Sequence, residues 1–82
     1  MDLVLLTEEL IKALAINKDD VTVKEFQSDD EDTILIQAMV NSDDIGRVIG
    51  KAGRNANAVR TLVQASSYLK KKKKVKINID SF

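Results

Sequence analysis

Three stretches of the chain have the pattern of hydrophobic and β-branched residues that predicts a β-strand. The first spans residues 21–26, and Phe26 is out of phase with Val21 and Val23, which indicates a bulge or the end of the strand. The second spans residues 33–40 and is rich in β-branched residues, with one face formed by Ile34, Ile36, Ala38 and Val40. In the third, Val75, Ile77 and Ile79 alternate with Lys76, Asn78 and Asp80.

Apolar residues spaced three or four positions apart predict three helices. The first helix begins at Asp2 or Thr7 and ends near Ile16. The second is short and follows a polar segment, residues 41–44, that is typical of a helix N-cap with acids in the first turn. The third and longest spans residues 54–69. The apolar stripe of the first helix comprises Leu3, Leu6, Leu10 and Leu14, and that of the second comprises Ile45, Val48 and Ile49.

The predicted elements follow the order α-β-β-α-α-β, which favours an α+β domain with three helices on one face of a three-stranded sheet. Residues 27–32, named here the acidic hairpin loop, join the first two strands. A lysine-rich linker, residues 70–74, precedes the last strand. A chain of 82 residues can bury one modest core, so we expect a single domain that spans residues 1–82.

The composition argues against catalysis. Only 4% of the residues are aromatic and 44% are hydrophobic, so the core must consist of Leu, Ile, Val and Ala. The chain has no cysteine and no histidine, and Ser66 and Ser67 have no candidate catalytic partner. The acidic hairpin loop lacks the glycine and the terminal glutamate of a calcium loop. We therefore expect a non-enzyme without a metal or a cofactor.

The sequence also predicts a cytoplasmic protein without membrane association. No apolar run approaches the roughly 18 residues that cross a bilayer. Asp2 stands where a signal peptide carries positive charge. The lack of cysteine is typical of a reducing compartment.

The two halves of the chain carry opposite charge although the total is zero. Residues 1–45 contain three basic and twelve acidic residues, a net charge of −9, and residues 46–82 contain ten basic and one acidic, a net charge of +9. A local excess of cations around a glycine-containing turn favours a directed patch for phosphates. The alternative is that the two halves of a small domain simply attract each other.

Two glycines bracket Lys51 and Ala52 between the second and third predicted helices, in the segment Gly50-Lys51-Ala52-Gly53, named here the glycine loop. Glycine lets the backbone turn tightly and approach a ligand closely, because it has no Cβ. The first amides of the following helix lack partners within that helix, and such amides bind phosphate groups. The loop is not a nucleotide P-loop, which has four residues between its glycines. It predicts a phosphodiester site, and the alternative is a plain turn between helices.

Several side chains near the glycine loop are candidates for the same ligand. Lys51 and Arg54 stand beside the glycines and are expected to contact phosphates. Arg47 before the loop and Arg60 after it either contact the ligand or form surface ion pairs of little energetic value. Of the two apolar residues before the loop, we expect one in the core and one on the floor of an apolar groove, with Ile49 the candidate for the groove and Val48 for the core.

The segment from Val48 to Arg60 resembles the helix-loop-helix of KH domains, in which a GxxG loop clamps a single-stranded nucleic-acid backbone. The N-terminal helix and C-terminal strand are similar to the bacterial type II KH arrangement. A chain filled by one such unit resembles the stand-alone KH proteins of the KhpA family, and the resemblance covers essentially all 82 residues. It implies RNA binding, self-association and pairing with the larger, Jag-type KH protein KhpB. Asn55-Ala56-Asn57 departs from the aliphatic residues often found after the loop.

The longest predicted helix carries more apolar surface than a single core requires. At about 100° per residue, its apolar residues cover close to half of the circumference, whereas one core needs a stripe of about 100°. The polar half comprises Asn57, Arg60, Thr61, Gln64, Ser67 and Tyr68. The surplus, named here the leucine stripe, comprises Ala58, Leu62, Ala65 and Leu69. Together with the implied self-association it predicts a homodimer, and the alternative is that both leucines are buried within the monomer.

Two functions remain open from the sequence. The first is a module that binds single-stranded RNA, as a post-transcriptional regulator or RNA chaperone. Single-stranded DNA remains an alternative ligand, because nothing in the sequence identifies a contact to the 2′-hydroxyl. The second is a protein-interaction module that acts mainly as an assembly subunit with a KhpB-type partner. An intact loop lysine favours the first, and a wide apolar helix surface favours the second.

Overall fold

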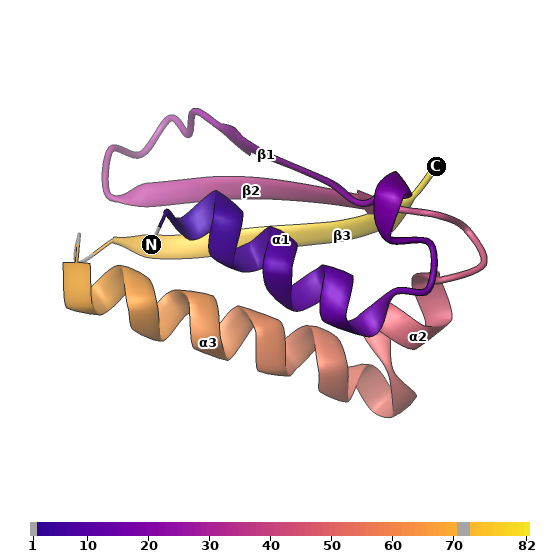
Figure 1. Ribbon diagram of the computed structural model, residues 1–82. Helices are drawn as coiled ribbons and strands as arrows, with labels where there is room; N and C mark the ends of the chain where they lie inside the picture. Colours follow the sequence, from indigo (N-terminus) through magenta and orange to yellow (C-terminus); the bar gives the residue numbers. More distant parts are fainter. Residues whose placement is uncertain (1, 71–72) are drawn as a thin grey trace.

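The computed structural model describes residues 2–70 and 73–82 and confirms the predicted order of helices and strands (Figure 1). Two short 3-10 turns, Lys18–Asp20 and Lys51–Gly53, are additional to the prediction. The helices are α1 (Leu3–Leu14), α2 (Ile45–Ile49) and α3 (Arg54–Lys70), and the strands are β1 (Thr22–Phe26), β2 (Thr33–Val40) and β3 (Lys74–Ser81).

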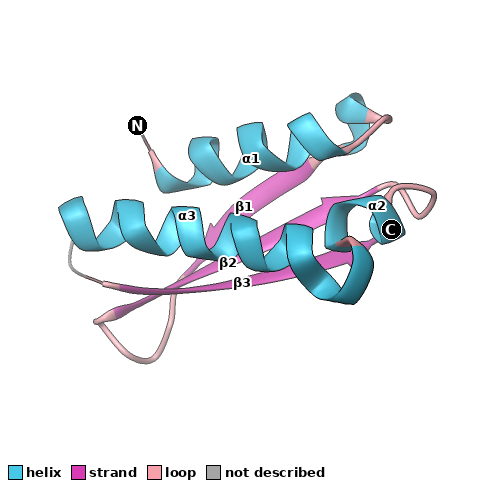
Figure 2. Ribbon diagram, turned by 90° about the horizontal axis from the view of Figure 1, so that it is seen from below, coloured by secondary structure: helices cyan, strands magenta, loops and turns pink. Residues whose placement is uncertain are grey.

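The strands form one sheet in the order β1-β2-β3, in which β1 and β2 are antiparallel and β2 and β3 are parallel. All three helices lie on one side of this sheet, as Figure 2 shows, and this confirms the predicted α+β class. No helix among residues 2–70 and 73–82 is both long and apolar enough to cross a bilayer.

Strand β2 supplies the centre of the core. Its residues Ile34, Ile36, Ala38 and Val40 are all buried on the helical side, as the alternation predicts. The pairing of β1 with β2 is regular up to Phe26, so the strand ends at this residue and contains no bulge. The Phe26 side chain is exposed, because the register places it on the side of the sheet away from the helices.

Two helix faces differ from the prediction, and in both a buried hydroxyl explains the difference. In α1 the fully buried residues are Leu3, Thr7 and Ile11, while the predicted Leu6, Leu10 and Leu14 are only partly buried. The Thr7 hydroxyl donates to the Leu3 carbonyl at 2.8 Å. In α3, Ser67 was assigned to the polar half but is buried beside Ala56, Val59 and Val63. Its hydroxyl donates to the Lys73 carbonyl at 2.7 Å, so neither hydroxyl is left unpaired in the core.

The lysine-rich linker is shorter than predicted. Lys70 belongs to α3 and Lys74 begins β3, while Lys71 and Lys72 lie outside the described residues. Arg54 begins α3 as predicted, and the helix ends one residue beyond the predicted boundary.

The segment before α2 is anchored by a buried carboxylate. Asp44 occupies the N-cap position, but its side chain does not cap the helix, and none of the acids lies in the first turn as predicted. Instead Asp44 Oδ2 accepts hydrogen bonds from the backbone amide of Asn17 at 2.8 Å and from Asn17 Nδ2 at 3.2 Å. The Asn17 amide lowers the pKa of the Asp44 carboxyl below its ordinary value, against the opposing effect of burial. The carboxylate therefore stays ionised at neutral pH and ties α2 to the segment that follows α1.

Candidate nucleic-acid interface

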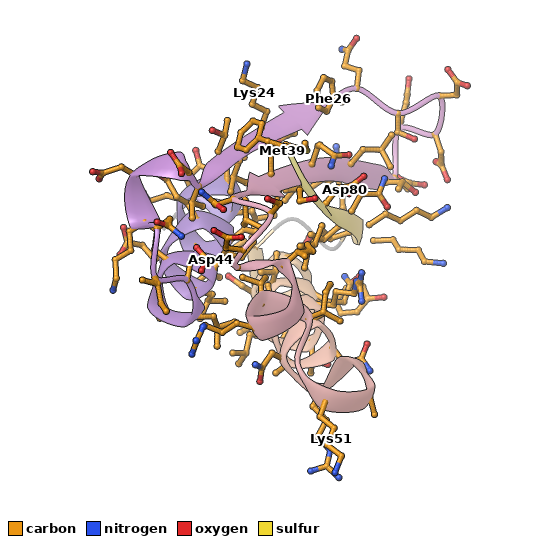
Figure 3. All side chains as sticks on the ribbon, turned by 90° about the vertical axis from the view of Figure 1, so that its right-hand side faces the viewer. Lys24, Phe26, Met39, Asp44, Lys51 and Asp80 are labelled. Atoms are coloured by element: carbon orange, nitrogen blue, oxygen red, sulfur yellow. The ribbon has the colours of Figure 1, made fainter. Side chains whose placement is uncertain are left out.

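The glycine loop lies at one end of the helical layer, where α2 meets α3 (Figure 1). Lys51 points away from the body of the molecule, as Figure 3 shows. Lys51, Ala52 and Arg54 are all exposed, so a ligand can reach the loop without any rearrangement of the core.

The backbone of the loop adopts positive φ angles at three of its four residues. Gly50 has φ 78° and ψ 170°, a region that is open almost only to glycine, and Gly53 has φ 75°. Ala52 has φ 55° and ψ 25°, a left-handed conformation that costs a non-glycine residue about 1–2 kcal/mol. The two glycines are thus required by the path of the chain, and Ala52 holds the loop in a strained shape.

Two neighbouring amides in the loop are open to a ligand. The amides of Gly53 and Arg54 donate to the carbonyls of Gly50 and Lys51, so the first amide of α3 is paired with a carbonyl that lies before the helix. Within the described part of the chain, the amides of Lys51 and Ala52 form no hydrogen bond. These two available donors lie inside the glycine loop.

Asn55 holds the two ends of the loop together, and the sequence analysis did not identify this role. Its Nδ2 donates to the Arg47 carbonyl at 2.9 Å and so satisfies a carbonyl in the last turn of α2. A Cβ placed on Gly50 would lie 2.8 Å from Asn55 Cγ, so the side chain packs directly over the glycine. Asn often forms hydrogen bonds with the backbone near helix ends, and this preference was the one signal of the role in the sequence. The sequence does not show which carbonyl accepts the bond, because Arg47 lies on the other side of the turn.

The basic side chains near the loop fall into two groups. Lys51, Arg54 and Arg47 are exposed and form no ion pair with any residue in the ranges 2–70 and 73–82. Arg60 is held in place, because its Nε donates to the Ile77 carbonyl on β3 at 3.3 Å. The first group is therefore free to neutralise phosphates, while Arg60 marks the junction of α3 and β3.

The apolar residues before the loop divide as predicted. Val48 is buried in the core, and Ile49 is half-buried and partly accessible. Helix α2, which carries both residues, packs against α3 and β3. Its contact with a base remains a prediction.

The leucine stripe is exposed along its whole length. Leu62 is 54% exposed and Leu69 is 87% exposed, and Ala58 and Ala65 are exposed as well. The alternative that both leucines are buried within the monomer is therefore wrong.

Comparison with known proteins identifies relatives over nearly the whole chain. The family model described as KhpA/KhpB, KH domain, matches residues 5–79. "RNA-binding protein KhpA" of Caldanaerobacter subterraneus subsp. tengcongensis is 45% identical over 74 residues, which are 90% of this chain and 95% of the relative. "RNA-binding protein KhpA" of Halalkalibacterium halodurans is 42% identical over 74 residues, which are 90% of this chain and 93% of the relative.

Solved structures share the fold at low sequence identity. The structure of Era in complex with MgGDPNP and a segment of 16S ribosomal RNA matches 96% of this chain with a TM-score of 0.68 and 15% identity. A structure of Aquifex aeolicus Era bound to GDP.AlF4- matches 98% of this chain with a TM-score of 0.70 and 14% identity. This chain spans less than a third of either Era chain, so the likeness concerns only a part of each.

Proposed function

The chain belongs to the KhpA/KhpB family of KH domains, and from this premise we propose that it binds single-stranded RNA through the glycine loop. The observation that carries the proposal is the pair of open amides at Lys51 and Ala52, flanked by exposed cations. Open amides beside positive charge form a site for an anionic oxygen, and the phosphodiester is the anion that a nucleic acid presents.

The contacts divide between backbone and bases. Phosphates lie against the loop amides and are neutralised by Lys51 and Arg54, with Arg47 close enough in sequence to contribute. Bases lie toward the partly accessible Ile49, and about four nucleotides fit such a site. Apolar contact without stacking gives modest affinity, so one module binds weakly and gains from longer RNA or from a partner.

The test replaces Lys51 and Ala52 by aspartate, which substitutes repulsion for attraction at the open amides. Aspartate tolerates the left-handed conformation of position 52, so the variant is expected to fold with stability changed by no more than about 0.5 kcal/mol. RNA binding is measured by fluorescence anisotropy, and the melting temperature is measured on the same preparation. Binding is expected to be lost, and a folded double variant with wild-type affinity would contradict the proposal.

A matched control carries the same change of charge elsewhere. Lys24→Asp with Gln27→Asp removes one cation and adds two anions, as the loop variant does. Both control positions are exposed, and Figure 3 shows Lys24 at the opposite end of the molecule from Lys51. The control is expected to bind RNA nearly as well as the wild type. Equal losses in the two variants would mean that net charge, and not the loop, determines binding.

We further propose that the leucine stripe forms the interface of a homodimer and offers the same surface to a KhpB-type partner. Exposed Leu62 and Leu69, with small alanines between them, suit the close approach of a second helix. Leu62→Asp is expected to give a folded monomer, because an unpaired charge in a dry interface is costly. Thr61→Asp, on the adjacent face, is the control and should remain dimeric.

Sedimentation velocity at tens of micromolar measures this association. A monomeric wild type would contradict the proposed homodimer. If monomeric Leu62→Asp still binds RNA, the leucine stripe and the glycine loop work independently of each other. If the loop variants leave RNA binding intact while the stripe captures purified KhpB, the protein is mainly an assembly subunit. We place its action in the cytoplasm, as a post-transcriptional regulator or RNA chaperone.

A further inference from the structure

Tyr68 is exposed over a shallow hollow that runs along the junction of α3 and β3. The hollow has a volume of about 460 Å³, and Tyr68 is 55% exposed. We call this hollow the α3–β3 seam; it is lined by Arg60, Thr61, Gln64, Ala65, Tyr68 and Val75. None of the three aromatic residues of the chain lies in the core, so Tyr68 contributes little to folding and is available for a ligand.

Side chains of α3 already occupy the outer edge of β3 along the seam. Gln64 donates from Nε2 to the Lys73 carbonyl at 2.9 Å and accepts from the Val75 amide at 2.8 Å. Arg60 Nε donates to the Ile77 carbonyl. Because these backbone groups have partners, an extended peptide cannot add to this part of the sheet edge. A ligand of the seam must therefore use the apolar walls and the aromatic ring.

The charge around the seam favours an anionic ligand. No acidic residue occurs between Gly46 and Ile79, a stretch that contains α3 and most of β3. Among the residues that line the seam, Arg60 supplies a cation, whereas Lys74 and Lys76 alternate with Val75 and lie on the open face of the sheet. An aromatic ring in line with a cation, in a stretch without carboxylates, is an arrangement that binds single-stranded nucleic acid by stacking and charge.

The seam also continues from the glycine loop along the same helix. Arg60, Gln64 and Tyr68 are spaced four residues apart, so they form a row on one side of α3 that rises about 12 Å from the first to the last. The row begins less than two turns after the loop. A strand held at the loop can therefore follow α3 directly into the seam.

We infer that RNA bound at the glycine loop extends along the α3–β3 seam and stacks a base on Tyr68. This inference rests on the proposed function, and it predicts a binding site longer than the four or so nucleotides of the loop. The ring of Tyr68 supplies the stacking surface, and Arg60 supplies the positive charge that directs the strand away from the loop.

The chain offers a direct test, because it contains one tyrosine and no tryptophan, so its intrinsic fluorescence reports Tyr68 alone. Titration with an RNA of about eight nucleotides is expected to quench this emission. An RNA of about four nucleotides should bind, as seen by anisotropy, without quenching. Tyr68→Ala should weaken binding of the longer RNA by at least about fivefold and leave the shorter one unchanged, while Tyr68→Phe should retain the affinity.

Phe26→Ala is the matched control, since Phe26 is 52% exposed but lies on the open face of the sheet. Its affinity for both RNAs should equal that of the wild type. The inference would be overturned if both RNAs bind without quenching and if Tyr68→Ala and the wild type bind with equal affinity. The proposed function would then still stand. Absence of binding to any RNA would overturn both.

Discussion

Two polar loops of the molecule, the acidic hairpin loop of six residues and the glycine loop of four, differ in the charge that lies beside their backbone amides. The acidic hairpin loop pairs two of its amides with its own side chains, since Ser28 Oγ accepts from the Asp30 amide at 3.1 Å and Asp30 Oδ1 accepts from the Asp32 amide at 2.9 Å. Asp30 Oδ2 also accepts from the Thr33 hydroxyl at 3.2 Å. Its four acidic side chains repel a phosphate, so this loop serves as a connection between β1 and β2.

The glycine loop leaves donors unused and holds them in a strained shape. Lys51 and Ala52 contribute open amides, and Ala52 has a left-handed backbone that only its surroundings maintain. Strain of this kind is found where a structure is held ready for a ligand. The difference teaches that a loop is a candidate site when it combines open amides with charge, and not merely when it is polar and exposed.

The largest expected effect comes from Gly50→Ala, which breaks the shape of the glycine loop. Alanine at this position would enter a backbone region almost reserved for glycine and collide with the Asn55 side chain. We expect the free energy of unfolding to fall by about 1–3 kcal/mol. RNA affinity should fall at least about tenfold, equivalent to about 1.4 kcal/mol. Urea denaturation and anisotropy measure the two effects.

Gly46→Ala is the matched control for this change. Gly46 lies within α2, and a Cβ there would meet no atom within 4 Å. The same substitution should therefore stabilise the protein by about 0.5–1 kcal/mol and leave RNA binding unchanged. If both alanine variants lose stability equally, the backbone conformation of Gly50 is not the cause of the loss in Gly50→Ala.

A smaller effect is expected from Asn55→Ala, which removes the hydrogen bond to the Arg47 carbonyl. The stability should fall by about 1 kcal/mol, and the affinity for RNA should fall severalfold because the loop ends are no longer held together. Asn57→Ala is the control, since Asn57 makes only a 3.5 Å contact with Arg60. An Asn55→Ala variant that binds RNA with wild-type affinity would contradict this prediction, because it would show that the hydrogen bond of Asn55 is not needed for RNA binding.

A modest effect is expected when three lysines before β3, Lys71, Lys72 and Lys73, are changed to Gln. Of these, Lys71 and Lys72 lie outside the described residues. Affinity should fall about equally for different RNA sequences. The slope of log affinity against log salt should flatten by about 0.7 for each phosphate that the protein no longer neutralises. Anisotropy at several salt concentrations measures both quantities.

The control makes an equal change of charge in the acidic half of the chain. It replaces Lys12, Lys18 and Lys24 by Gln. This control should leave the salt slope nearly unchanged. A sequence-selective loss in the first variant, with an unaltered slope, would contradict a general role for its lysines.

The smallest effect is expected in the other loop of the comparison. Asp29→Asn with Glu31→Gln removes two charges from the acidic hairpin loop but leaves its internal hydrogen bonds in place. RNA affinity should rise by less than about twofold at moderate salt, because exposed charges are screened over distances of about 10 Å. A tenfold gain would mean that the overall field of the protein outweighs the local geometry of the glycine loop.

Elements with strict periodicity could be predicted from the sequence. The range of β2 was predicted without error, because a run rich in β-branched residues extends from Thr33 to Val40 between the polar segments 27–32 and 41–44. The start of α3 was also predicted, because a glycine turn marks it. The burial of Thr7 and Ser67 could not be predicted, since their hydroxyls look polar until the carbonyls that accept from them are known.

The candidate site was predicted in composition but not in detail. The glycines and cations follow from their spacing in the sequence, and the loop forms where they indicate. The identity of the open amides depends on φ angles within the loop, which spacing alone does not define. The role of Asn55 depends on a contact across the turn, and the hydrogen bonds of Asp44 to Asn17 join residues 27 positions apart. These features required the folded chain.

The central claim is that the open amides of the glycine loop receive the RNA backbone, and a titration followed by two-dimensional ¹H–¹⁵N NMR tests it residue by residue. On addition of a short single-stranded RNA, the amide signals of Lys51 and Ala52 are expected to shift most, because they gain hydrogen bonds to phosphate. The signals of Asp30 and Asp32, whose amides are already paired, should remain in place. Saturable binding with the Lys51 and Ala52 signals unmoved, and the largest shifts elsewhere, would contradict the account.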